Sequence, residues 1–271
     1  MNLAKQIAKL RQRCGHTPLA LITGGSSGMG RIYAQRLAEA GCDLLLVSNQ
    51  EAELEQTARS LHETYGVRAI ARYQDLSAPE AAEELCAYCE EQGLVVDILI
   101  NNAGMFFFEE LSPENEAKAL TMLQLHVYTP TRLCVLLGEE MKRRGYGYIL
   151  NVSSMAAELP CPGIAVYSAT KAYLKSFSKS LYYEMRPYGV GVTTVCPGAI
   201  ATPLYKLKPS LLKMGVKIGL IGTPEWLVCR ALRGLFRKRR VVKPGFMNYY
   251  LPPLVALLPK WLVDRLWRKF S

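Results

Sequence analysis

The stretch Gly147-Tyr-Ile-Leu-Asn-Val-Ser-Ser154, taken with Tyr167-Ser-Ala-Thr-Lys171, decides how the rest of the chain is interpreted. The apolar and β-branched run before Ser154 predicts a buried strand that ends in two serines. Tyr167 follows Ser154 by thirteen residues, and Lys171 follows Tyr167 by four. That last spacing is about one helical turn, so we expect both side chains on one face of a helix.

These residue types suit proton transfer at a carbonyl or alcohol oxygen. A phenol has an ordinary pKa of about 10, and an ammonium group one turn away favours the phenolate and lowers that pKa. A serine hydroxyl at the end of the neighbouring strand can hydrogen-bond the same substrate oxygen. The Tyr/Lys spacing alone also fits an ordinary amphipathic helix with a surface lysine, so other motifs must decide.

A glycine-rich turn near the start of the chain is the second motif. A short apolar strand, 18–23, runs into Thr23-Gly-Gly-Ser-Ser-Gly-Met-Gly30, and a helix is expected over about 31–40. Glycines let the backbone approach a pyrophosphate, and a helix N-terminus offers unpaired N–H groups. The glycine spacing is looser than the common dinucleotide fingerprint, so a plain glycine turn is the alternative to nucleotide binding.

Apolar strands and helical segments alternate through the rest of the chain. This rhythm predicts a parallel sheet covered on both faces, in one domain without a linker. Further strands are expected at 43–47, 67–73, 95–100, 148–152, 190–195 and near Val241; helices are expected at 51–65, 79–92, 113–144 with Pro130 marking a bend or a start, from Tyr167 to about 186, and 223–237.

Over about residues 18–202 the chain resembles the classical short-chain dehydrogenase/reductases. The motifs that carry the resemblance occur in that family's order: Thr23-Gly24-x-x-x-Gly28-x-Gly30, Asp75, Asn101-Asn102-Ala103-Gly104, Ser154, Tyr167-x-x-x-Lys171, and Pro197-Gly198 with Thr202 beyond. The resemblance implies an α/β fold of Rossmann type, a doubly wound seven-stranded parallel sheet, and a nicotinamide cofactor.

The resemblance also implies roles for individual residues. Tyr167 would be the general acid/base, Ser154 would orient the substrate carbonyl, and Lys171 would hold the nicotinamide ribose and lower the pKa of Tyr167. Asp75 and Leu76 would meet the adenine, residues 102–104 the adenine ribose and nicotinamide side, Gly198 and Ile200 the carboxamide, and Thr202 the carboxamide or the phosphates. The full set of expected cofactor-binding residues is Gly24, Ser26, Ser27, Gly28, Met29, Gly30, Ser48, Asn49, Asp75, Leu76, Asn102, Ala103, Gly104, Val152, Tyr167, Lys171, Pro197, Gly198, Ile200 and Thr202.

One position departs from the family pattern. Where the family often has a fourth catalytic residue, an asparagine, this chain has His126 in Leu123-Gln-Leu-His-Val127. In the family the backbone carbonyl of that residue helps to hold a water next to the lysine, which a histidine also allows. The alternative is a packing residue with a satisfied imidazole.

The choice of cofactor depends on the end of the second strand. Users of NAD in this family usually have an acidic residue there, and users of NADP often have an arginine; this chain has Ser48, Asn49 and Gln50. Without a carboxylate there is no repulsion of a 2′-phosphate, and Ser26, Ser48 and Asn49 can donate hydrogen bonds to it. We therefore expect NADP(H), with NAD(H) as the alternative.

Charge is distributed unevenly along the chain, whose net charge is +10. Residues 1–17 carry four basic and no acidic residues, and residues 203–271 carry fifteen basic and two acidic ones. No aromatic-basic motif supports nucleic acid as a partner, so an anionic membrane surface is the favoured interpretation. No apolar run of about 18 residues predicts a membrane-spanning helix. The N-terminus lacks the apolar core of a signal peptide.

Eight scattered cysteines indicate no disulfide framework, so a reducing cytoplasm is the expected location, with peripheral contact at the inner face of a membrane. The close pair Cys86 and Cys89 has no matching partners, and no metal site is expected.

Three segments are predicted: a basic amphipathic segment at 1–17, the dehydrogenase domain at 18–245, and an amphipathic tail at 246–271. The stretch 203–222 lacks a clear period and is expected to cover a hydrophobic substrate. Residues 259–270 place Trp267 and other apolar residues on one stripe and basic residues on the other, as in helices at a membrane interface. Packing of that stripe on the protein or on a sister subunit is the alternative.

The expected activity is therefore hydride transfer to a hydrophobic ketone, or from the secondary alcohol, by a homodimer or homotetramer. Long-chain 3-keto lipids, such as 3-ketosphinganine or 3-ketoacyl compounds, and steroids are the leading substrate classes. The alternative is a non-catalytic nucleotide-binding or membrane scaffold protein of the same fold.

Overall fold

Seven parallel strands form one twisted sheet at the centre of the computed structural model, which describes residues 2–159, 161–198, 222–245 and 247–257. Their order across the sheet is β3-β2-β1-β4-β5-β6-β7, and every neighbouring pair is parallel. The strands are β1 Leu19–Thr23, β2 Asp43–Ser48, β3 Ala69–Tyr73, β4 Val96–Asn101, β5 Gly147–Val152, β6 Val190–Val195 and β7 Val241–Val242. This confirms the predicted doubly wound seven-stranded sheet.

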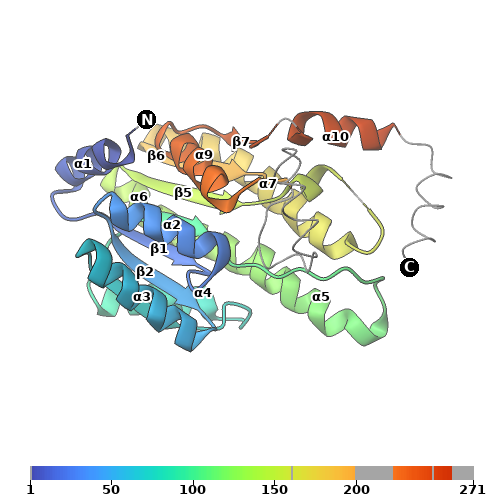
Figure 1. Cartoon of the computed structure of the whole chain (residues 1–271), viewed down its shortest axis with the longest axis horizontal. Helices are drawn as coiled ribbons and strands as arrows, with labels where there is room; N and C mark the ends of the chain where they lie inside the picture. Colours follow the sequence, from blue (N-terminus) through green and yellow to red (C-terminus); the bar gives the residue numbers. More distant parts are fainter. Residues whose placement is uncertain (1, 160, 199–221, 246, 258–271) are drawn as a thin grey trace.

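Helices cover both faces of the sheet (Figure 1). The principal helices are α1 Leu3–Cys14, α2 Gly28–Glu39, α3 Glu51–Tyr65, α4 Ala81–Glu91, α5 Glu116–Leu123, α6 Thr129–Arg144, α7 Ala165–Met185, α9 Pro224–Phe236 and α10 Met247–Ala256. Apolar side chains of α1, α2, α3 and α9 form one core with the sheet, and those of α4, α6 and α7 form the other. Every residue of β1, β4 and β6 is buried, as expected for strands covered on both faces.

The N-terminal helix α1 packs its apolar face against the rest of the domain. Ile7 and Leu10 are 1% and 4% exposed and lie in the core beside α2 and α9. The Arg11 guanidinium donates to Gly41 O at 3.1 Å and that of Arg13 to Gly145 O at 2.6 Å. Both acceptors follow a helix C-terminus, where a cation is stabilised by the helix dipole. Two of the four basic side chains that suggested a membrane contact are thus bound within the protein.

Several boundaries differ from the prediction. Helix α2 begins three residues early, at Gly28, because Ser27 is its N-cap. The segment 113–144 contains two helices as predicted, with Pro130 in the first turn of α6, but a π-helical turn, Gln124–Tyr128, joins them. Helix α10 was not predicted, since it contains Pro252 and Pro253. Ile200, Thr202, most of the predicted covering stretch and the predicted helix at 259–270 lie outside the described residues.

Candidate active site

A cavity of about 570 Å³ opens where the strand order reverses, beyond the carboxyl ends of β1 and β4. Open α/β sheets bind their ligands at this switch point. The cavity brings together most of the residues expected from the sequence: Gly24, Ser26, Ser27, Gly28, Met29, Ser48, Asn49, Asp75, Leu76, Asn102, Ala103, Gly104, His126, Val152, Tyr167 and Lys171.

Four described residues of the expected set do not line this cavity. Gly30 packs inside the turn, where a Cβ would lie only 1.9 Å from Gly24 O. Ser154 is 7% exposed, and its Oγ accepts a hydrogen bond from Ala156 N at 3.1 Å as the N-cap of the 3₁₀ turn η3, Met155–Glu158. Pro197 O accepts from Met155 N at 2.7 Å, and a Cβ on Gly198 would lie 2.7 Å from Oδ1 of Asn248 on α10.

The glycine turn is shaped for close approach of a phosphate. Gly24 and Gly28 have φ of +66° and +53°, in the region that favours glycine. Ser27 makes no side-chain cap bond to α2, and the first N–H groups of a helix have no partner within the helix. These donors, together with the helix dipole, favour an anion at this position.

The fourth strand holds the turn in place. Thr23 Oγ1 accepts hydrogen bonds from Asn102 N at 2.9 Å and Ala103 N at 3.0 Å. In return the Asn102 amide donates to Thr23 O at 3.0 Å. A Cβ on Gly24 would lie 3.0 Å from Asn102 Nδ2 and from Ala103 Cα. Asn102 therefore aligns the two strand ends that frame the cavity.

Hydroxyl groups occupy the end of the cavity near β2. Ser26 Oγ donates to Gln50 Oε1 at 2.9 Å and lies 2.9 Å from Ser48 Oγ. The Gln50 backbone N–H donates to Ser48 Oγ at 3.2 Å. With its hydroxyl proton directed to Gln50, Ser26 acts as an acceptor toward Ser48. The serine hydroxyls expected to meet a 2′-phosphate are thus engaged with each other and with Gln50, which lines the same cavity.

Tyr167 and Lys171 lie on one face of α7 and line the other end of the cavity. Lys171 is 6% exposed, its Nζ donates to Val152 O at 3.1 Å, and it lies 5.7 Å from the centre of the Tyr167 ring. Burial lowers the pKa of Lys171 to about 8. The Phe106 ring packs edge-on against the Tyr167 ring at 5.0 Å.

His126 lies in the π-helical turn and is 1% exposed. Its Nε2 accepts the backbone N–H of Met105 at 3.0 Å, so the neutral ring carries its proton on Nδ1, which donates to Thr170 Oγ1 at 3.1 Å. Thr170 Oγ1 in turn donates a hydrogen bond to the backbone carbonyl oxygen of Tyr167 at 2.8 Å. Burial, and then the charge of Lys171, hold the pKa of His126 well below its usual value. The imidazole is satisfied on both sides and also lines the cavity.

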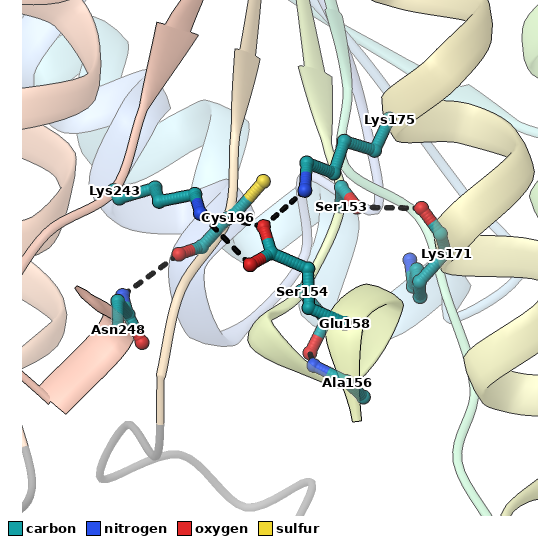
Figure 2. A network of polar contacts seen from close by, with 9 residues as sticks. All are labelled: Ser153, Ser154, Ala156, Glu158, Lys171, Lys175, Cys196, Lys243 and Asn248. Atoms are coloured by element: carbon teal, nitrogen blue, oxygen red, sulfur yellow. Dashed lines mark hydrogen bonds and ion pairs between the residues drawn. The ribbon is translucent and has the colours of Figure 1, made fainter. Parts of the chain in front are cut away.

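An ion-pair network lies beside Ser153 and Ser154, the two serines that follow β5 (Figure 2). Glu158 on η3 pairs with Lys175 on α7 and with Lys243 after β7; the Lys243 bond to Oε2 is 2.9 Å. Burial opposes ionisation of Glu158, but the two ammonium groups outweigh it and hold its pKa below the usual value. The network ties η3, which Ser154 caps, to α7 and to the chain after β7.

Other cavity residues were not in the expected set. They are Gln50, Gln74, Ser77, Met105, Thr121, Leu125 and Ser153. Nothing in the sequence separates most of these from ordinary loop and helix residues. Ser153 is an exception, because it belongs to the quoted strand end; its Oγ donates to Lys171 O at 2.7 Å.

The cavity fits a dinucleotide. An anion site at the glycine turn, a polar pocket at the end of β2 and a buried lysine beside a phenol lie along one continuous space. Of the expected contacts, those of Ile200 and Thr202 fall outside the described residues.

The chain belongs to the short-chain dehydrogenase family, whose model matches residues 18–210. The family binds NAD(P)(H), and the chain is an oxidoreductase of this class. It is 35% identical over 252 residues to a very-long-chain 3-oxoacyl-CoA reductase of Bos taurus, covering 90% of this chain and 76% of the relative. It is 33% identical to hydroxysteroid dehydrogenase-like protein 1 of Gallus gallus, covering 90% and 72%. Among solved structures, a short-chain dehydrogenase from Sphingobium yanoikuyae in complex with NADPH is 29% identical, with a TM-score of 0.75 and coverage of 89% and 96%.

Proposed function

We propose that the protein transfers a hydride between NADP(H) and a hydrophobic ketone or secondary alcohol, with a long-chain 3-keto lipid as the leading substrate class. The observation that carries this proposal is the single cavity in which a glycine turn and the Tyr167/Lys171 pair face the same space. The former suits a pyrophosphate, and the latter suits proton transfer at an oxygen.

The bound nicotinamide would supply or accept the hydride. Tyr167 would give a proton to the carbonyl oxygen, or take one from the alcohol, at its phenol oxygen. Lys171, fixed by Val152 O at 3.1 Å, would hold the ribose and stabilise the ionised phenol. Ser154, which follows the cavity-lining Ser153, would donate a hydrogen bond to the substrate oxygen, since accepting from Ala156 N does not use its hydroxyl proton.

His126 would act as a positioning residue. Its bonds to Met105 N and, through Thr170, to Tyr167 O link the loop after β4 to the helix that carries the phenol. Its own proton stays on Nδ1, so we assign it no part in proton exchange with the substrate.

A second, smaller cavity supports a hydrophobic substrate. It has a volume of about 180 Å³, shares Tyr167 with the first cavity, and is lined mainly by apolar side chains and backbone: Phe107, Glu109, Glu110, Leu111, Pro162, Gly163, Ile164, Ala165 and Val166. Because Tyr167 lines both cavities, an acyl chain bound here would contact the residue that carries the phenol. The 3-oxoacyl-CoA reductases among the relatives support the same substrate class.

Activity on a panel of ketones, from 3-ketoacyl and 3-ketosphinganine compounds to steroids, tests the proposal. Each ketone is offered with NADPH and separately with NADH, and cofactor consumption is followed. We expect turnover of at least one 3-keto lipid with NADPH. Cofactor binding without turnover of any panel member would favour the scaffold alternative, and the absence of cofactor binding would contradict both.

We also propose peripheral membrane contact through residues 259–270, at the cytoplasmic face. Among the residues that the structure describes, no helix is both long and apolar enough to cross a bilayer.

A homodimer or homotetramer is proposed as well, supported by apolar side chains exposed on α5, α6, α7 and the turn between α5 and α6: Leu120, Leu123, Tyr128, Val135 and Tyr173. Sedimentation equilibrium measures that assembly.

A further inference from the structure

Three potential metal ligands converge at the amino-terminal edge of the sheet, away from the nucleotide cavity. The Sγ of Cys14, a ring nitrogen of His16 and a carboxylate oxygen of Asp97 all lie within 4.8 Å of one another. Cys14 ends α1, His16 precedes β1, and Asp97 is the second residue of β4. Figure 1 shows α1 at the end of the sheet opposite α5.

The local backbone explains how Cys14 and His16 face the same point. Gly15 ends α1 with φ of +77°, a left-handed conformation that reverses the chain between them. The Cys14 thiol then lies 3.1 Å from His16 O, and the His16 ring reaches back toward β4. Any side chain at residue 15 would be strained in this conformation.

Asp97 is the unusual member of the cluster. It is 0% exposed, and its Oδ2 accepts from Leu19 N at 2.9 Å and meets His16 Nε2 at 3.0 Å. Its Oδ1 is buried with no hydrogen-bond partner among the described residues. A buried carboxylate oxygen without a partner is costly, and a ligand at this oxygen would remove that cost.

We propose that Cys14, His16 and Asp97 form a zinc site. A thiolate, an imidazole and a carboxylate are the ligand types that Zn²⁺ takes, in tetrahedral geometry. Bonds of about 2.0–2.3 Å place such ligands roughly 3.5 Å apart, close to the present separations, which are all within 4.8 Å. Water completes the fourth position, since the His16 side chain is 38% exposed and leaves an entry path.

Zinc here has a structural role, because the three ligands come from separate parts of the fold. The ion joins the end of α1 to the start of β1 and to β4, a strand at the centre of the sheet. It therefore fastens the N-terminal helix to the domain without touching the nucleotide cavity. The inference is independent of the proposed oxidoreductase activity.

Metal binding to the full-length, tag-free protein tests the site. After removal of metal with a chelator, Co²⁺ is titrated as a spectroscopic substitute for Zn²⁺, and stoichiometry is measured by elemental analysis after loading with zinc. We expect one ion per chain, a thiolate-to-cobalt absorption band, and a rise in Tm of roughly 5 °C with excess zinc. We also expect slower amide exchange in residues 3–14.

Variants assign the ligands. Cys14→Ser is expected to abolish the thiolate band and His16→Asn to weaken metal binding at least tenfold, whereas Cys229→Ser, an exposed cysteine on α9, leaves both unchanged. Neither ligand variant removes Asp97, which also accepts from Leu19 N and whose loss would endanger folding. The proposal would be overturned if Cys14→Ser bound metal as tightly as the wild type, or if the wild type bound no metal. An ordered water would then be the partner of Asp97 Oδ1.

Discussion

His126 Nε2 accepts the Met105 amide proton at 3.0 Å, and the adjacent Gly104 is what makes room for that ring. A Cβ on residue 104 would lie 2.9 Å from the same nitrogen, closer than real Cβ contacts allow. The loop at Gly104–Met105 therefore packs tightly against the His126 ring, and a substitution in either one should change the position of the other.

Gly104→Ala is expected to displace the imidazole, with a loss of about 1–3 kcal/mol in stability and about tenfold or more in kcat. The reason is that the ring positions Thr170 and hence the helix that carries Tyr167. In the His126→Asn background, whose side chain is shorter, the same substitution should cost much less. A double-mutant cycle on Tm and kcat measures the coupling; additive effects would show that loop and ring are independent.

Tyr167→Phe is expected to reduce turnover by at least 10³-fold while leaving cofactor affinity within about threefold, because only the proton-transferring hydroxyl is removed. Single-turnover kinetics and cofactor fluorescence titration separate the two effects. Tyr173→Phe, on the same helix but 40% exposed, is the matched control. An active Tyr167→Phe protein would exclude the phenol as acid/base.

Lys171→Met is expected to stabilise the cofactor-free protein by about 1–3 kcal/mol at neutral pH. Burial lowers the pKa of Lys171 from 10.5 to about 8, so below pH 8 the folded protein bears the full cost of a buried charge. Between pH 8 and 10.5 the unfolded chain binds more protons than the folded one, and wild-type stability rises with pH.

The difference between Lys171→Met and wild type should therefore be largest below pH 8 and shrink as pH rises toward 10.5. Chemical denaturation at a series of pH values measures it. A difference that is constant across this range would mean that Lys171 does not titrate as its burial requires.

Asn49→Asp is expected to weaken NADPH at least tenfold and to change NADH affinity little. Asn49 lines the cavity at the end of β2, and the substitution adds a negative charge there with almost no change in shape, which repels a 2′-phosphate. Affinities for both cofactors are compared in the wild type and the variant. Equal weakening of NADH and NADPH would point to a structural effect, and a wild type that prefers NADH would overturn the proposed cofactor choice.

Removal of residues 258–271 is expected to lower binding to anionic vesicles at least fivefold, since this segment carries the Trp-bearing basic stripe. Truncation after Leu257 retains α10, in which Asn248 donates to Cys196 O at 2.9 Å. Co-sedimentation with anionic and with neutral vesicles gives the comparison. If full-length and truncated chains bind anionic vesicles equally, the tail has no such role.

The sequence by itself determined that the sheet is parallel and where the glycine turn lies, because these follow from local signals, whereas the number of strands was expected from the family resemblance. Continuous apolar runs, glycines where φ is positive and a one-turn Tyr/Lys spacing are all readable along the chain. Asp75 and Asn102 were expected from the family resemblance rather than from a local signal. The structure places both around one cavity with Gly24 and Tyr167, since the carboxyl ends of parallel strands share an edge.

Only the tertiary structure decided the contacts that join distant segments. The hydrogen bonds from Met105 to His126 and from His126 to Thr170 form because a π-helical turn directs the imidazole toward the loop after β4. Asp97 meets His16 only because β1 and β4 are neighbours. Such pairings depend on packing between elements far apart in sequence, and no spacing rule along the chain encodes them.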